Sequence, residues 1–279
     1  MNKKNEKLIR GQALLVVLLS LSVVLIIVLY IVSRSITDIS LSTKDEEALR
    51  AFSAAEAGIE RALIIGSDTG NVTVGDASFN AKISSFAQGE TEVTYPIALK
   101  SGQSATFWFA RPNEPDFTGD QMKICWGNSG SPNGDSQTPA LELTIVYAVS
   151  PNDLSTLRIA RATLDPNSAR ILQNNFNSAQ TTGCSVGGED FQFFSNISFS
   201  SFTGQLQYAK ARLVYNTDAT HKVGIDVSAS GSVLPSQGFL VDSQGSFGSA
   251  NRRIELYELH PVAPPIFENV IFSSGGITK

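Results

Sequence analysis

The sequence predicts an α+β protein in which one long N-terminal helix precedes a large β-rich globular region. An uncharged apolar run occupies residues 13–32, and a polar segment of helical periodicity continues from it. Beyond that segment, alternating or β-branched runs are separated by clusters of Gly, Asn, Pro and Ser, which is typical of short strands. We therefore expect a leader at 1–11, a helix over 12–65 whose membrane-spanning half is 13–32, and a β-rich extracytoplasmic region over 66–279.

The apolar run has the length of a membrane span. Its 20 residues, at about 1.5 Å per residue, match the roughly 30 Å of hydrocarbon in a bilayer. Four basic residues precede it (Lys3, Lys4, Lys7 and Arg10), which predicts a cytoplasmic N-terminus and an outward-facing remainder. A secretory signal peptide is the alternative, but its apolar core is about 7–15 residues long and ends at a cleavage site of small residues. Here the run is longer and continues into more helix.

The second half of the predicted helix is amphipathic. Small and apolar residues recur at spacings of three, four and seven, namely Leu41, Ala48, Phe52, Ala55, Ile59 and Ala62. Glu46 and Arg50 form an i,i+4 pair in the favourable order. Gly58 costs about 1 kcal/mol relative to Ala in an exposed helix, whereas in a packed helix it would let another backbone approach closely. Gly66 is a plausible helix stop.

Two cysteines, Cys125 and Cys184, both lie beyond the apolar run. In an oxidising compartment one disulfide is the economical interpretation, and two buried free thiols are the alternative. A bridge would close a loop of about 60 residues and stabilise the fold by roughly 4 kcal/mol in the chain-entropy model.

The sequence offers little evidence of catalytic chemistry. His221 and His260 are the only histidines and share no ligand spacing, and neither a glycine-rich phosphate loop nor a GxSxG motif occurs. We expect no catalytic residues, metal or cofactor. The net charge of −5, with no basic patch outside residues 1–11, argues against a nucleic-acid partner. The aromatic residues Phe107, Trp108, Phe109 and Trp126 suit core packing, with a sugar or protein contact surface as the alternative.

The strands of the globular region are expected where apolar and polar residues alternate. The predicted strands are Ser78–Ser84, Glu92–Leu99, Ala105–Ala110, Met122–Trp126, Ala140–Val149, Thr156–Leu164, Phe191–Phe199, Tyr208–Tyr215, Lys222–Val227, Phe239–Asp242 and Arg253–Leu259. Asn167–Asn175 is expected to be a turn or short helix. The region is either one β domain or two sheets in series, with a possible break at 185–190. A strand or covering segment and a loose tail are expected after Pro261.

About 65 residues at the N-terminus, a quarter of the chain, resemble type IV pilins and pseudopilins. The resemblance rests on the leader MNKKNEKLIRG, the apolar run QALLVVLLSLSVVL and the segment AFSAAEAGIERAL at 51–63, the last being most similar to minor pilins of the PilX type. It implies cleavage by a prepilin peptidase after Gly11, which leaves Gln12 as the new N-terminus. It also implies membrane lipid, other pilin subunits, an assembly platform and an ATPase as partners. The helix and filament packing residues would be Leu14, Val16, Leu18, Phe52, Ala55, Gly58 and Ile59.

Two positions depart from the pattern of major pilins. Gln12 stands where those proteins carry a methylated aromatic residue, and Val16 stands where they carry a glutamate. That glutamate offsets the cost of burying an N-terminal ammonium in an apolar filament core. A subunit with Val16 offers no such carboxylate, which suits a subunit present in few copies.

The expected function is therefore that of a minor type IV pilin or pseudopilin, a low-copy structural subunit of a surface filament that primes assembly or mediates adhesion. Two alternatives remain open at this point. One is a permanently membrane-anchored extracellular binding protein, an adhesin or a sensor. The other is a surface hydrolase, for which the sequence provides no good constellation of polar residues.

Overall fold

The computed structural model describes residues 9–262, and the chain divides into two compact units. Unit 1 comprises Met1–Ile83 together with Val241–Leu256, and unit 2 comprises Ser84–Leu240 together with Tyr257–Lys279. The first eight leader residues and the tail predicted after Pro261, from residue 263 onwards, lie outside the described residues. The α+β class is confirmed.

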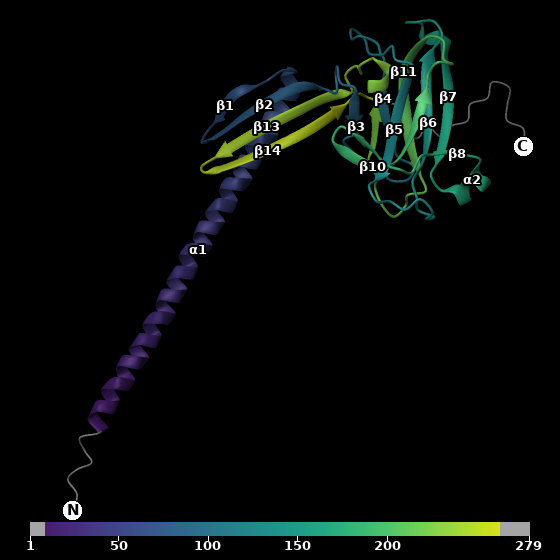
Figure 1. Ribbon diagram of the computed structural model, residues 1–279. Coiled ribbons are helices and arrows are strands. Elements are labelled where there is room, and N and C mark those ends of the chain that lie inside the picture. The colour runs from purple at the N-terminus through teal and green to yellow at the C-terminus, as the bar shows by residue number, and fades with distance from the viewer. Residues whose placement is uncertain (1–8, 263–279) are drawn as a thin grey trace, which may run out of the picture. The chain divides into compact units, whose positions relative to one another are not determined.

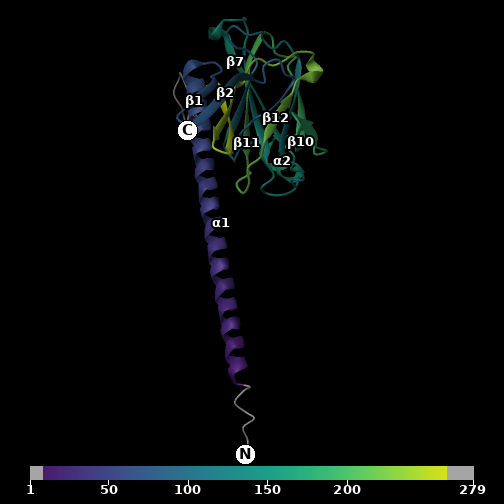
Figure 2. The ribbon, with the colours of Figure 1, turned by 90° about the vertical axis from the view of Figure 1, so that its left-hand side faces the viewer.

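Unit 1 is built on a single helix, α1 (Ile9–Ile65). It runs without interruption from the apolar half into the polar half and extends well beyond the strands of its unit (Figures 1 and 2). Gly66 ends it, as predicted, in a left-handed conformation (φ 65°) with its N–H donating to the carbonyl of Ala62 at 2.8 Å. Glycine adopts this conformation at no steric cost, and the bond satisfies one of the helix's terminal carbonyls.

A four-stranded sheet covers the C-terminal part of α1. Its strands are β1 (Gly70–Val74), β2 (Ala77–Phe86), β13 (Gly238–Phe247) and β14 (Ala250–Leu259), in the order β1-β2-β13-β14. Two-residue turns join β1 to β2 and β13 to β14, and each begins with a glycine of positive φ, Gly75 or Gly248. Most of unit 2 lies in the segment between β2 and β13, and the ends of β2, β13 and β14 also belong to unit 2.

Unit 2 is a β-sandwich. One five-stranded sheet has the order β3-β12-β5-β10-β9, and the other has the order β4-β11-β6-β7-β8. The strands of the first sheet are β3 (Glu92–Thr94), β5 (Gln121–Asn128), β9 (Cys184–Val186), β10 (Glu189–Ser198) and β12 (Val223–Asp226). Those of the second are β4 (Ser104–Trp108), β6 (Ala140–Ala148), β7 (Leu157–Asp165), β8 (Asn177–Ser178) and β11 (Gln205–Val214). The short helices are η1 (Leu154–Thr156), α2 (Ser168–Asn174) and η2 (Ser228–Ser230).

One hydrophobic core joins the two sheets of unit 2. Trp126 and Phe193 come from the first sheet, and Phe107, Leu143 and Leu213 come from the second, all essentially inaccessible to solvent. Alternate residues of these strands point inward, as the period of two requires. The core identifies unit 2 as one domain rather than two sheets in series.

The predicted break at 185–190 is wrong. Cys184–Val186 and Glu189–Ser198 form an antiparallel hairpin inside unit 2, with Gly187 and Gly188 in its turn. The glycines that suggested a linker supply the positive φ angles of that turn. The unit boundaries lie instead at Ile83/Ser84 and Leu240/Val241, within strands that carry no compositional signal.

Every predicted strand overlaps an observed one, and Asn167–Asn175 contains the short helix α2. The prediction missed β1, β8 and β9, which have five, two and three residues. Strands this short offer too few positions for alternation to be recognised in the sequence. They are extended because they pair with neighbouring strands. The predicted strand Glu92–Leu99 is also shorter than expected, because β3 ends at Thr94.

The disulfide between Cys125 and Cys184 is confirmed. It joins β5 to the edge strand β9, and the order of the sheet places β10 between these two strands. The bridge packs in a small buried cluster with Val186 and Phe191, away from the main core. A cross-link spanning 59 positions stabilises the fold by about 4 kcal/mol in the chain-entropy model.

Candidate functional site

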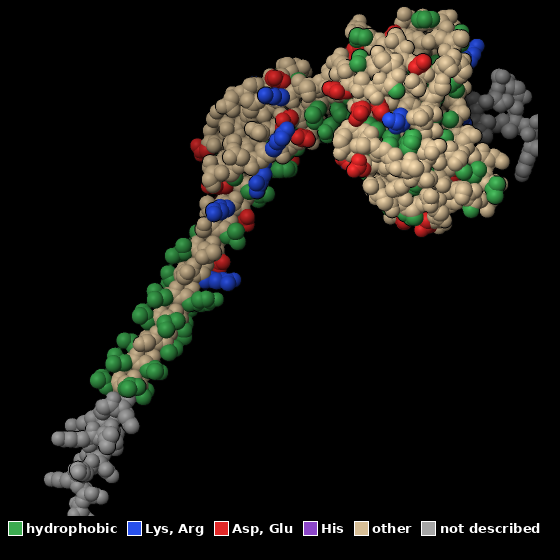
Figure 3. Space-filling model, viewed as in Figure 1, with side chains coloured by type: hydrophobic (Ala, Val, Ile, Leu, Met, Phe, Trp, Pro, Cys, Tyr) green, Lys and Arg blue, Asp and Glu red, His purple; other side chains and the backbone are tan. Residues whose placement is uncertain are grey.

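The N-terminal half of α1 is an uncovered apolar surface. Leu14, Val16 and Leu18 are 65%, 63% and 56% exposed, and the other large side chains up to Val32 are similarly open. Figure 3 shows hydrophobic side chains covering the visible face of this half. Within residues 9–262, α1 is the one helix long and apolar enough to cross a membrane.

The two serine hydroxyls of this half are satisfied within the helix. The hydroxyl of Ser20 donates to the carbonyl of Val17 at 2.9 Å, and that of Ser22 donates to Leu18 at 2.8 Å. Internal satisfaction is what a hydrocarbon environment requires, because no water is present there to pair with a hydroxyl. The chemistry of this half therefore suits lipid or the apolar faces of other helices.

C-terminal to the apolar run, charged side chains begin at Arg34. Arg34 lies 3.9 Å from Asp38, and the predicted pair of Arg50 and Glu46 is formed at 2.5 Å. Both pairs are exposed, so each contributes only a few tenths of a kcal/mol. Glu47 accepts bonds from the Ser249 amide at 3.1 Å and hydroxyl at 2.8 Å, and these bonds lower the pKa of Glu47. They connect α1 to the β13–β14 turn.

The docked face of α1 is lined by small residues. Ala51, Ala55 and Ala62 are fully buried, Ile59 is 8% exposed, and Gly58 is buried among them. Ile59 and Ala62 pack with Ala81 of β2 and Val241 of β13. Small side chains allow the helix to lie close to the sheet, so close packing rather than large apolar area holds the two together.

Two glycines mark the closest approach of α1 and β13. A Cβ atom on Gly245 would lie 2.1 Å from the Ala51 carbonyl oxygen and 2.3 Å from the Ala55 nitrogen. A Cβ atom on Gly58 would lie 2.2 Å from the Oγ of Ser243. Gly58 therefore admits a side chain of β13, and the close contact with backbone that we expected at Gly58 occurs at Gly245.

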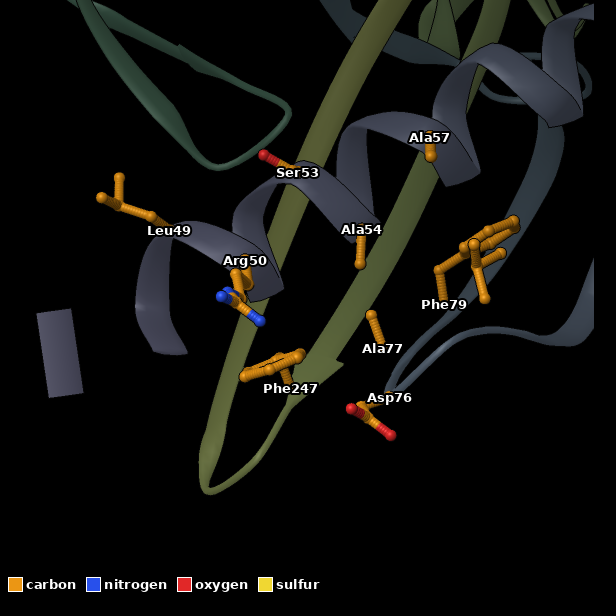
Figure 4. A pocket seen from close by; sticks show the side chains of 10 residues that line it. Leu49, Arg50, Ser53, Ala54, Ala57, Asp76, Ala77, Phe79 and Phe247 are labelled. Atoms are coloured by element: carbon orange, nitrogen blue, oxygen red, sulfur yellow. The ribbon is translucent and has the colours of Figure 1, made fainter. Parts of the chain in front are cut away.

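We call the contact of Ala51, Ala55 and Gly58 of α1 with Ser243 and Gly245 of β13 the seam. A hollow of about 460 Å³ opens beside the seam, between α1, the β1–β2 turn and β13 (Figure 4). In Figure 4, Ala54 and Ala57 line the helix side, Phe79 and Ala77 line the β2 side, and Phe247 lies beneath Arg50. The Arg50 guanidinium carbon is 4.8 Å from the centroid of the Phe247 ring, a cation–π contact. The hollow is apolar with Arg50 and Asp76 among its lining residues, and it could receive an apolar side chain.

The predicted packing residues occupy three settings. Leu14, Val16 and Leu18 lie on the uncovered half, whereas Ala55, Gly58 and Ile59 lie on the docked face. Phe52 is 43% exposed, because the sheet meets the row through Ala51, Ala55, Gly58 and Ala62, and Phe52 is beside that row. Gly11 and Gln12 fall in the first turns of α1, and the structure does not describe their surroundings.

Sequence reasoning missed Ser243 and Gly245, which complete the seam on the sheet side. A signal existed in the alternation Val241, Ser243, Gly245, where side chains of decreasing size lie on the buried face of β13. The pattern could be connected to α1 only once the strand was known to lie against the helix.

Other residues singled out in the sequence have structural roles in unit 2. Phe107, Phe109 and Trp126 are core residues, whereas Trp108 is partly exposed. His221 is 6% exposed, and its Nδ1 accepts the Asn128 amide at 3.1 Å; burial lowers the pKa of His221. Among residues 9–262, no group of three or more His, Cys, Asp and Glu side chains is arranged to hold a metal ion.

Comparison with known proteins finds no match to the chain among family models, curated proteins or solved structures.

Proposed function

We propose that this chain is a low-copy structural subunit of a surface filament, a minor type IV pilin or pseudopilin. One observation carries the proposal. The uncovered apolar half and the docked half form a single uninterrupted helix. A surface of this kind must be covered by lipid or by other apolar helices, and a continuous helix transmits a pull on its apolar half to its docked half.

The proposed cycle follows from that chemistry. The subunit waits in the cytoplasmic membrane with its N-terminus inside, as the four basic residues of the leader favour. A prepilin peptidase cuts after Gly11, and a platform protein and an ATPase then move the helix from lipid into a bundle of like helices in the extracellular filament. One apolar solvent replaces another, so close packing supplies the driving force.

A permanently anchored extracellular binding protein, an adhesin or a sensor, is the second candidate. Unit 2 contains a groove of about 660 Å³ lined in part by Trp108 and Tyr208. This groove favours the second candidate, because a binding role needs a ligand site and no filament. Such a protein would retain its leader and stay in the bilayer.

Co-expression with a prepilin peptidase distinguishes the two. If the peptidase cleaves after Gly11, the measured mass of the protein should decrease by the mass of residues 1–11. The substitution Gly11→Val should prevent this decrease. Ser20→Val is the matched control, since it alters the apolar half without touching the junction. An unchanged mass favours the anchored protein, and cleavage in the thirties by ordinary signal peptidase contradicts both candidates.

A further inference from the structure

Unit 2 contains a groove that the filament proposal does not use. It has a volume of about 660 Å³, within the roughly 300–1,000 Å³ typical of small-molecule sites. Trp108, Val146 and Tyr208 line it, whereas their strand neighbours Phe107, Ile145 and Ala209 lie in the core, so the groove is on the outer face of the β4-β11-β6-β7 sheet. The segment that follows β4 and the segment that joins β6 to β7 border it. Its lining comprises Trp108, Ala110, Arg111, Pro112, Asn113, Glu114, Asp116, Val146, Asn152, Leu154, Leu157, Gln205, Gln207 and Tyr208.

The apolar part of the groove is built from neighbouring strands. Tyr208 is paired in register with Trp108 on one side and with Val146 on the other. The rings of Trp108 and Tyr208 lie 5.2 Å apart at 55°. Leu154, 66% exposed, and Leu157, 38% exposed, extend this surface. An apolar strip of this kind matches the C–H faces of a ligand rather than its polar edges.

The polar part is a set of planar groups that hold one another in place. The amide of Gln205 donates to the Asp116 carboxylate at 2.6 Å. The same side chain accepts the Asn152 N–H at 3.0 Å and the Gln207 amide at 3.1 Å. Pre-formed positions reduce the entropy lost on binding. Asp116 keeps a second carboxylate oxygen, and Gln207 keeps an amide oxygen, as acceptors for ligand hydroxyls.

Arg111 closes one side of the groove. Its guanidinium carbon lies 5.2 Å from the Trp108 ring centroid, and its Nη2 donates to the Nδ1 of His260 at 3.2 Å. Glu114 is held by the Ser236 N–H at 2.6 Å. With one cation and two carboxylates, the lining does not favour an anionic ligand such as a phosphate.

An extended peptide is also disfavoured, because the neighbouring sheet edge is occupied. The side chain of Gln237 accepts the Trp108 N–H at 2.7 Å and donates to the Trp108 carbonyl at 2.9 Å. These are the main-chain groups that a peptide adding to β4 at Trp108 would need.

We infer that this groove binds a neutral saccharide. A sugar ring presents apolar C–H faces and a rim of hydroxyls that both donate and accept, and the groove offers an apolar aromatic strip beside fixed amide, carboxylate and guanidinium groups. The inference goes beyond the filament proposal and does not depend on it, because every lining residue belongs to unit 2.

The full chain, purified in a zwitterionic detergent that carries no sugar headgroup, is titrated with neutral linear trisaccharides of glucose, N-acetylglucosamine, galactose and mannose. The chain has two tryptophans, of which Trp126 is fully buried and Trp108 lines the groove. Saturable binding of at least one trisaccharide should therefore change tryptophan fluorescence, and calorimetry should give the same dissociation constant.

Gln207→Ala should weaken that binding about tenfold, since it removes hydrogen bonds to a ligand. Leu154→Ala should weaken it less. Gln121→Ala, on the other sheet, and Leu172→Ala, 86% exposed on α2, are the matched controls and should bind like the parent. Absence of binding to all four trisaccharides, or equal affinities for Gln207→Ala and Gln121→Ala, overturns the inference. Neither outcome bears on cleavage after Gly11, so the two proposals fail separately.

Discussion

At the scale of single residues, the most constrained charged group of unit 2 is Asp165. Its carboxylate is inaccessible to solvent and accepts bonds from Arg170 at 2.7 and 2.8 Å, from the Asn174 amide and from the Asn167 N–H. Burial alone would raise the pKa of Asp165, but the bonds from Arg170 and its neighbours outweigh burial and lower the pKa. The paired carboxylate therefore stabilises the fold above the ordinary pKa of about 3.8, and that contribution is lost as the pH falls through the lowered value.

Arg170 also fixes the loop that precedes β6. It donates to the carbonyls of Ser136 and Thr138 at 2.9 and 2.7 Å, and its guanidinium carbon lies 3.9 Å from the centroid of the Tyr215 ring. A single side chain thus joins the end of β7, the helix α2 and the loop before β6.

We predict that Arg170→Ala lowers the free energy of unfolding of unit 2 by about 3–5 kcal/mol, because it leaves the buried Asp165 charge without its partner. Arg161→Ala is the control. Arg161 lies 3.9 Å from Glu142 and is 63% exposed, so its loss should cost no more than about 1 kcal/mol. Denaturant titration followed by tryptophan fluorescence measures the free energy of unfolding of both variants. Equal losses would contradict the prediction.

At the scale of elements, the seam between α1 and β13 depends on the absence of side chains. The buried row of α1 offers three alanines and Gly58, and β13 offers Gly245 at the point of closest approach. Gly245 does not have a positive φ, so the position requires glycine for lack of space rather than for backbone conformation. A clash there involves backbone atoms of the helix, which cannot rotate away as the Ser243 hydroxyl could from Gly58.

Gly245→Ala should therefore force α1 away from the sheet and destabilise unit 1 by at least the roughly 1–3 kcal/mol typical of overpacking. Gly134→Ala is the matched control, since a Cβ atom at Gly134 meets nothing within 4 Å and its φ is ordinary. Hydrogen exchange measures the result. Amides of residues 51–62 should lose protection in Gly245→Ala alone, and unchanged protection would show that the seam is looser than the structure indicates.

At the scale of the whole molecule, the proposed function rests on the uncovered half of α1 and on position 16. Val16 is 63% exposed on that half. In the proposed filament, a neighbour's N-terminal ammonium would find no carboxylate at this position, and an unpaired charge in an apolar core is costly. Few copies of such a subunit can be accommodated.

We predict that Val16→Glu increases the number of copies along the filament shaft, as counted by quantitative immuno-labelling. Val17→Glu is the control, because a carboxylate at the neighbouring position carries a similar insertion cost and lies on a different side of the helix. If the parent protein already labels the shaft in bulk, the low-copy assignment is wrong. If both variants behave alike, the charge-pairing argument is wrong.

The α+β class, the long helix and its end at Gly66, the disulfide, and the positions of most strands followed from the sequence. These features depend on local periodicity, on the conformational freedom of glycine or on the number of cysteines. Each of these signals can be read from neighbouring residues or from composition. The seam residues Ser243 and Gly245, the division of the chain at Ile83 and Leu240, and the groove around Trp108 and Gln205 came from the tertiary structure. Each of these joins segments distant in sequence, and space and polar partners at such contacts are set by the packing of the whole chain rather than by any local pattern.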